Sequence, residues 1–195
     1  MGNTKIKTST PFPFLFTLLS IIAFAASMEL VLDKLRILEN PNFKPSCDLN
    51  PFFSCSSVMQ TPQANLFGFP NPILGIIGFA ITLTIGMMLI SRVGLNKLFA
   101  YGLLIGLAFA FGLVLYFWYL VIFVLHHFCL YCMIVWACVI PMFFLTINYL
   151  NETGFLGRES GFFGGLSRWT WPAIFLFYII IYGGVWLAYL KLTAI

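Results

Sequence analysis

Charged side chains are scarce in this sequence. Asp, Glu, Lys and Arg make up 8% of the 195 residues, whereas about 25% is usual in soluble globular proteins. A chain with so few charges cannot cover a surface that faces water, which excludes a soluble domain. The formal net charge of +4 is small and spread along the chain, so it indicates membrane topology rather than a nucleic-acid partner.

Hydrophobic residues, by contrast, make up 61% of the chain, and five apolar stretches are long enough to cross a bilayer. A spanning helix takes about 20 mostly apolar residues, because its backbone polar groups must be satisfied within the segment. The predicted helices cover residues 12–32, 73–90, 98–125, 128–150 and 169–190. The predicted fold is therefore an all-α integral membrane protein, a single transmembrane domain over residues 1–195, with its longest loop at 33–70.

The first predicted helix has two interpretations. Its basic flank, apolar core and Ala23-Phe24-Ala25 sequence could form a cleavable signal peptide. The apolar run continues past that site through Met28, which favours a retained helix. Near the other end of this helix, Glu29 and Asp33 are expected at a solvated interface.

Two features predict how the later helices pack. Pro141 should kink the fourth helix, because proline removes a backbone hydrogen bond inside a helix. Gly102-x-x-x-Gly106 should let the third helix pack closely against a neighbour.

Lys and Arg in short connections indicate the orientation, because such connections are usually cytoplasmic. Three segments on one side of the predicted membrane carry Lys5, Lys7, Arg92, Lys97, Arg158 and Arg168. The other side carries Lys34, Arg36, Lys44 and Lys191, so the bias is moderate. The N-terminus is therefore expected in the cytoplasm, and loop 33–70 and the turn at His126-His127 are expected outside.

Four of the five cysteines form two pairs. Cys47 and Cys55 lie in the long outer loop, and Cys129-Leu-Tyr-Cys132 lies where the fourth helix begins. The predicted topology places both pairs at the same membrane face, and thiols exchange electrons only by direct contact between sulfurs. Unpaired N–H groups at a helix start stabilise a thiolate, which is the attacking species. A spacing of three residues also places both helix sulfurs on one face.

Other interpretations of these residues are open. Cys47 and Cys55 alone could form a structural disulfide in a membrane scaffold. Cys129 and Cys132, with His126 and His127 just upstream, could instead bind a metal or handle heme. Cys138, inside the fourth helix, is expected to be a small buried hydrophobic residue.

Three motifs together resemble the vitamin K epoxide reductase family. They are the segment from Cys47 to Val58 (CDLNPFFSCSSV), the segment from Phe69 to Gly75 (FPNPILG) and Cys-Leu-Tyr-Cys at 129–132. The resemblance covers roughly residues 14–150. It implies a four-helix bundle around a quinone, with an outer loop that caps the bundle, and the fifth predicted helix is additional to it.

The resemblance also implies roles for individual residues. Cys47 would exchange with a thioredoxin-like partner and pass electrons to Cys55, which would attack Cys129, and Cys132 would reduce the quinone. Asn71 matches a family asparagine that hydrogen-bonds a quinone carbonyl, although Asn followed by Pro is also a common helix start. Trp136 stands where vertebrate members carry a quinone-contacting tyrosine, and it could donate its indole N–H or wall the pocket.

The expected activity is quinone-dependent thiol–disulfide oxidoreduction that supports disulfide formation. The acceptor would be a menaquinone, ubiquinone or phylloquinone-type quinone. Many bacterial relatives carry a fused thioredoxin-like domain after the fifth helix, whereas this sequence stops at Ile195. The partner is therefore expected to be a separate thioredoxin-fold protein on the outer face. A bacterial cytoplasmic membrane is the expected location, in preference to the endoplasmic reticulum.

Overall fold

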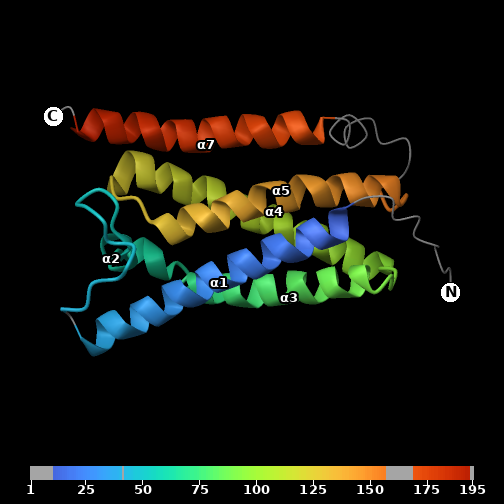
Figure 1. The fold of residues 1–195 in the computed structure, drawn as a ribbon, viewed down its shortest axis with the longest axis horizontal. Helices are drawn as coiled ribbons and strands as arrows, with labels where there is room; N and C mark the ends of the chain where they lie inside the picture. The colour runs from blue at the N-terminus through green and yellow to red at the C-terminus, as the bar shows by residue number, and fades with distance from the viewer. Residues whose placement is uncertain (1–10, 41, 157–168, 194–195) are drawn as a thin grey trace.

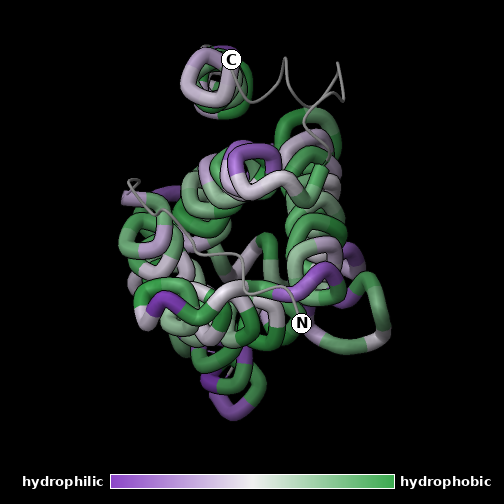
Figure 2. Tube along the Cα trace, turned by 90° about the vertical axis from the view of Figure 1, so that its right-hand side faces the viewer, coloured by the Kyte–Doolittle hydropathy of each residue, from purple (hydrophilic) through white to green (hydrophobic). Residues whose placement is uncertain are grey.

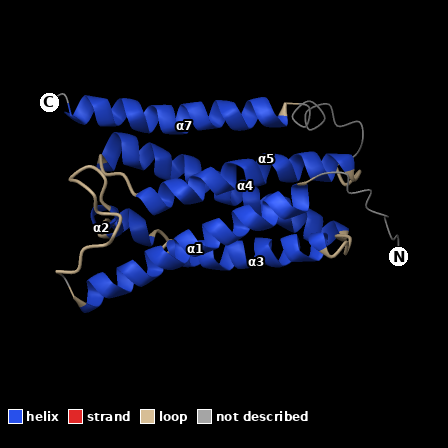
Figure 3. Ribbon diagram, viewed as in Figure 1, coloured by secondary structure: helices blue, strands red, loops and turns tan. Residues whose placement is uncertain are grey.

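The computed structural model describes residues 11–40, 42–156 and 169–193, and within them five long helices run along a common direction (Figure 1). Each is long and apolar enough to cross a membrane. They are α1 (Phe12–Glu39), α3 (Pro72–Ile90), α4 (Lys97–Leu120), α5 (Leu130–Glu152) and α7 (Thr170–Thr193). Helices and loops make up the described chain (Figure 3). The all-α integral membrane fold expected from the sequence is confirmed.

Helix α5 is the central element of the bundle. It packs against α1, α4 and α7, while α1 also packs along α3. Its second half is largely buried, with Ile140, Met142 and Leu150 inaccessible to solvent. Many large apolar side chains are exposed on the outside of the bundle as well, and α7 lies at one edge of it (Figure 2). An apolar exterior over an apolar core is the pattern that lipid requires of spanning helices.

The outer loop is shorter than expected. Helix α1 continues to Glu39, so the loop begins at Asn40 instead of at residue 33. No Gly or Pro interrupts residues 33–40, and Arg36 donates to Asp33 one turn earlier, at 3.1 Å, which supports the added turns. The remaining loop contains the short helix α2 (Cys55–Met59) and the 3₁₀ helix η1 (Pro62–Asn65).

The third predicted helix ends irregularly. After α4 the chain forms a π-helical segment, η2 (Val121–Leu125), which ends at His126 in a left-handed conformation with φ of 58°. Such a bulge redirects the chain. The chain then extends through Cys129, so α5 begins at Leu130 rather than at 128.

The connection between α3 and α4, with Arg92 and Lys97, lies at the opposite end of the bundle from α2 (Figure 1). The other basic residues assigned to the same side lie outside the described residues: Lys5, Lys7, Arg158 and Arg168.

Close helix packing occurs at glycines other than those expected. A side chain at Gly102 or Gly106 would meet nothing within 4 Å, so that motif does not form a helix contact within the described chain. On α3, by contrast, Gly75 lies against Ser27 and Gly86 lies against Thr17, both on α1. Small residues therefore bring α1 and α3 together, as is common between membrane helices.

Helix α7 compensates for the proline in α5. Pro141 has no N–H, so the carbonyl of Ala137 lacks its usual partner four residues ahead. The Tyr178 hydroxyl on α7 donates to that carbonyl at 2.6 Å, and the Tyr182 hydroxyl donates to the Met133 carbonyl at 2.7 Å. Helix α7 thus supplies the hydrogen bond that the proline removes.

This pairing predicts a specific coupling. Tyr178→Phe should lower the free energy of unfolding in detergent by about 1–3 kcal/mol, because it leaves a buried carbonyl unpaired. The same change in a Pro141→Ala background should cost less, because alanine restores the N–H at that position of the helix. Tyr119→Phe, at an exposed position on α4, is the control and should change stability by less than about 0.5 kcal/mol. Equal costs in both backgrounds would contradict the compensation.

Candidate active site

The outer loop is fixed to the start of α5 by backbone pairing. Phe128 N–H donates to the Phe52 carbonyl at 2.7 Å, and Ser54 N–H donates to the Phe128 carbonyl at 3.0 Å. A ring nitrogen of His127 lies 3.0 Å from the Pro51 carbonyl. Because a cysteine follows each paired segment, this register brings Cys55 and Cys129 together.

Helix α2 places Cys55 as its first residue. The Ser54 side chain caps the helix by accepting from Ser57 N–H at 3.2 Å. Asp48, next to Cys47, accepts from Ser56 N–H at 3.1 Å and also from the Ser56 hydroxyl. An anion at a helix start is favoured by the unpaired N–H groups there. One carboxylate thereby joins the segments that carry the two loop cysteines.

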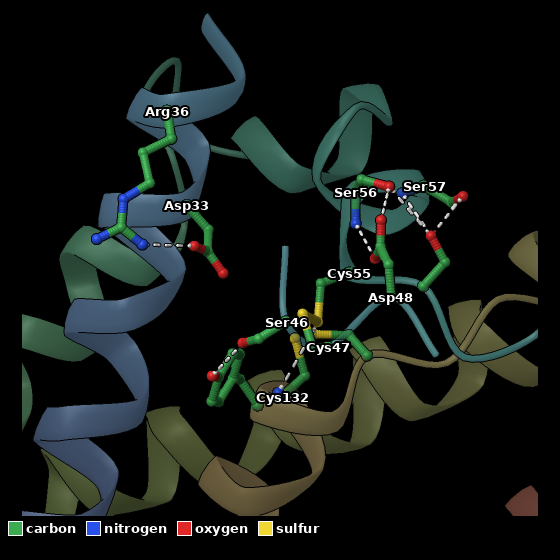
Figure 4. The surroundings of a disulfide bond; sticks show 12 residues. Asp33, Arg36, Ser46, Cys47, Asp48, Cys55, Ser56, Ser57 and Cys132 are labelled. Atoms are coloured by element: carbon green, nitrogen blue, oxygen red, sulfur yellow. Dashed lines mark hydrogen bonds and ion pairs between the residues drawn. A yellow bond between two sulfur atoms is a disulfide. The ribbon is translucent and has the colours of Figure 1, made fainter. Parts of the chain in front are cut away.

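The cysteines of the two pairs meet directly. Cys47 and Cys55 form a disulfide, whereas Cys129 and Cys132 are free thiols. The Cys129 Sγ–H donates to Cys55 Sγ at 3.4 Å, and Cys129 Sγ accepts from Cys132 N–H at 3.3 Å as the N-cap of α5. The Cys47–Cys55 disulfide, shown in Figure 4, therefore lies in contact with the Cys129 thiol at the start of α5, the geometry that thiol–disulfide exchange requires.

The sulfurs are enclosed. Cys55 is 0% exposed, Cys129 is 2% exposed and Cys47 is 3% exposed. Together with Leu30 and Met59 they form one apolar group, the sulfur cluster. Hydrogen bonds hold the loop against α5 and α1, including one at 2.6 Å from the Lys34 ammonium to the Met59 carbonyl.

Asp33 is also enclosed, contrary to the expectation of a solvated interface. It is 2% exposed and pairs with Arg36 through one oxygen only. The expectation failed because α1 continues past Asp33 and is covered there by the loop.

Asn71 lies at the start of α3, at the same end of the bundle as α2 (Figure 1), but its side chain does not cap the helix. Its oxygen accepts from Leu66 N–H at 2.9 Å, and its amide nitrogen donates to the Gln63 carbonyl at 2.7 Å. The side chain therefore orders the loop before α3. The amide has a second hydrogen, which leaves one donor for a ligand.

Trp136 is 4% exposed and belongs to the bundle core. Among the described residues, no hydrogen bond is formed by its indole N–H. Cys138 lies in the same core, apart from the sulfur cluster.

The metal interpretation gains no support from the described residues. His126 and His127 do not join Cys129 and Cys132 in a group close enough to share an ion. The ligand-type side chains that do come together there are Cys47, Asp48 and Cys55, two of which are already joined as a disulfide.

Apolar spanning helices that carry a disulfide against free thiols define a membrane redox protein that exchanges thiols and disulfides. The model of the vitamin K epoxide reductase family matches residues 14–147, more than half of the chain, and the chain belongs to that family. It is therefore a membrane oxidoreductase, in a family whose electron partner is generally a quinone. A search of curated proteins found no match.

The role of Asp48 yields a testable prediction. Asp48→Ala should free the start of α2 and let the loop open more often. The loss of charge-assisted hydrogen bonds worth about 1.5–3 kcal/mol should speed reduction of the Cys47–Cys55 disulfide by dithiothreitol about tenfold or more. Trapping the released thiols with maleimide and mass spectrometry measures this rate. Glu39→Ala, at an exposed end of α1, is the control, and equal rates in both variants would show that other contacts hold the loop.

Proposed function

We propose that this protein oxidises a reduced thioredoxin-like protein and passes the electrons through its four paired cysteines to a quinone. The observation that carries this proposal is the 3.4 Å contact between Cys129 Sγ and Cys55 Sγ, with Cys55 in a disulfide and Cys132 one turn away. The net result is a disulfide in the partner protein and a quinol in the membrane.

The electrons move in two stages, and each stage consists of two thiol–disulfide exchanges. A partner thiolate attacks Cys47, the Cys47–Cys55 bond breaks, and Cys55 leaves as a thiolate. A second partner thiol then attacks the bond between the partner and Cys47, which completes the partner disulfide and leaves the loop reduced. Cys55 next attacks Cys129 of an oxidised helix pair, which releases Cys132. Finally Cys47 attacks Cys55 and releases Cys129.

The state in the structure corresponds to the end of this sequence, with the loop oxidised and the helix thiols reduced. The helix start holds the pair in place, because Cys132 N–H donates to Cys129 Sγ. Cys132 is less enclosed than Cys129, and this fits its role as the thiol that faces the electron acceptor.

A quinone accepts two electrons and two protons from such a dithiol. The donors that would hold a carbonyl of a menaquinone, ubiquinone or phylloquinone-type ring are the second amide hydrogen of Asn71 and the indole N–H of Trp136. The first is supported by an amide already held in position by Leu66 and Gln63. The second is supported by an N–H that forms no hydrogen bond within the described chain.

The cysteine end of the bundle faces the outside of a bacterial cytoplasmic membrane in this proposal, and the N-terminus is cytoplasmic. Arg92 and Lys97 support this orientation, because they lie at the opposite end from the cysteines (Figure 1). The thioredoxin-like partner would be a separate protein on the outer face.

Single Cys→Ser variants test the relay. Replacing Cys47, Cys55, Cys129 or Cys132 should abolish quinol formation driven by a reduced thioredoxin-fold protein, because each removes one link in the transfer of electrons. Cys138→Ser is the matched control and should retain turnover, because Cys138 lies outside the sulfur cluster. Quinol absorbance in detergent or liposomes reports the rate. Sustained turnover without Cys47 or Cys55 would exclude the relay.

The order of transfer has its own test. In Cys132→Ser, Cys129 has no partner in its own helix, so a Cys55–Cys129 mixed disulfide should accumulate after mild oxidation. Peptide mapping without reduction detects the linkage. If Cys129 links only to Cys47, the proposed order is wrong.

A further inference from the structure

The sulfur cluster has a second carboxylate beside it, on α1. Leu30, Asp33 and Ile37 follow one another at intervals of three and four residues, so they lie on one face of α1. Leu30 and Ile37 both pack into the sulfur cluster. Asp33 therefore shares the face of α1 that covers the disulfide. With 2% exposure it is a buried ionisable residue, and such residues in membrane proteins commonly have a function.

One carboxylate oxygen of Asp33 accepts a hydrogen bond and the other does not. Oδ1 accepts from Arg36 Nη1 at 3.1 Å. Oδ2 is buried and has no hydrogen-bond partner within the described chain. Figure 4 shows the paired oxygen turned to Arg36 and the second oxygen on the side of the disulfide. Because buried polar atoms are nearly always paired, this free oxygen requires an explanation.

The other charged groups around Asp33 are already engaged or lie outside the cluster. Asp48 uses both carboxylate oxygens on Ser56, and Lys34 donates to the Met59 carbonyl. Glu29 and Arg36 act on Asp33 from its own helix, and Glu29 is exposed. The loop and α5 contribute thiols and the Tyr131 hydroxyl, which lies 3.1 Å from the Ser46 hydroxyl. Among these carboxylates, Asp33 alone combines burial with a free oxygen.

We propose that Asp33 Oδ2 accepts the thiol proton of Cys47 during the last exchange of the relay. Cys47 attacks Cys55 of the Cys55–Cys129 bond, and its proton passes to the Asp33 carboxylate, directly or through one water. The Cys47–Cys55 bond forms and the Cys55–Cys129 bond breaks. The Cys47 sulfur is oxidised, and the Cys129 sulfur is reduced and leaves as a thiolate. Arg36 holds the carboxylate in position through Oδ1. This assignment rests on the proposed function.

The test follows formation of the loop disulfide in the full-length protein. Reduced protein in detergent is mixed with a short-chain benzoquinone, quenched with acid at intervals and alkylated, and the Cys47–Cys55 disulfide is measured by mass spectrometry between about pH 6 and pH 9.5, a range that brackets the ordinary thiol pKa. Asp33→Asn should slow this step roughly 100-fold near neutral pH. The difference should shrink toward the alkaline end, where an ordinary thiol with a pKa of about 8.5 ionises unaided.

Three further variants separate proton transfer from a structural role. Asp33→Glu should restore part of the rate, Arg36→Lys, which keeps a cation beside the carboxylate, should keep the wild-type dependence on pH, and Glu29→Gln should match wild type. An unchanged rate in Asp33→Asn would overturn the assignment. So would a loss in Asp33→Asn that is equal at every pH and is shared by Arg36→Lys. A wild-type protein whose cysteines the quinone leaves reduced would instead refute the proposed function.

Discussion

The short backbone pairing between Phe52–Ser54 and Phe128 is the constraint on which the redox site depends. Each segment of this pairing leads directly into a cysteine, so a slip of one residue would turn a sulfur away from its partner. Caps at the two helix starts reinforce the register, with Ser54 before α2 and Cys129 before α5. The π-helical turn before His126 redirects the chain so that this pairing forms. The contact between the sulfurs is therefore set by local backbone geometry.

The sequence predicted the spanning helices well, because lipid demands long apolar runs that are visible without any structure. It also predicted the family, because three motifs carry four cysteines in a specific order. It missed the added turns of α1 and the enclosure of Asp33, because these depend on which helix face the loop covers. The role of Asp48 was missed, although this residue directly follows Cys47, because that role depends on a hydrogen bond from Ser56 in another part of the loop. The roles of the four cysteines, Asn71 and Trp136 stay predictions.

Helix α7 lies beyond the segment that matches the family, yet it is coupled to the helix that carries the redox thiols. Proline in α5 leaves Ala137 without a helical partner, and Tyr178 provides the missing hydrogen bond. Tyr182 adds a second bond at Met133, directly after Cys132. A helix added to the four-helix bundle can therefore support the active segment without contributing a reacting group.

The burial of the Cys47–Cys55 disulfide has a consequence for which reductants can react with it. Because Cys47 is 3% exposed, no reductant reaches its sulfur until the outer loop moves away from α1 and α5. This movement breaks several hydrogen bonds. A protein that binds the loop can offset this cost with its own contacts, whereas a small thiol such as glutathione has too little surface to do so. The closed loop thereby favours oxidation of a large protein that fits it over oxidation of small thiols.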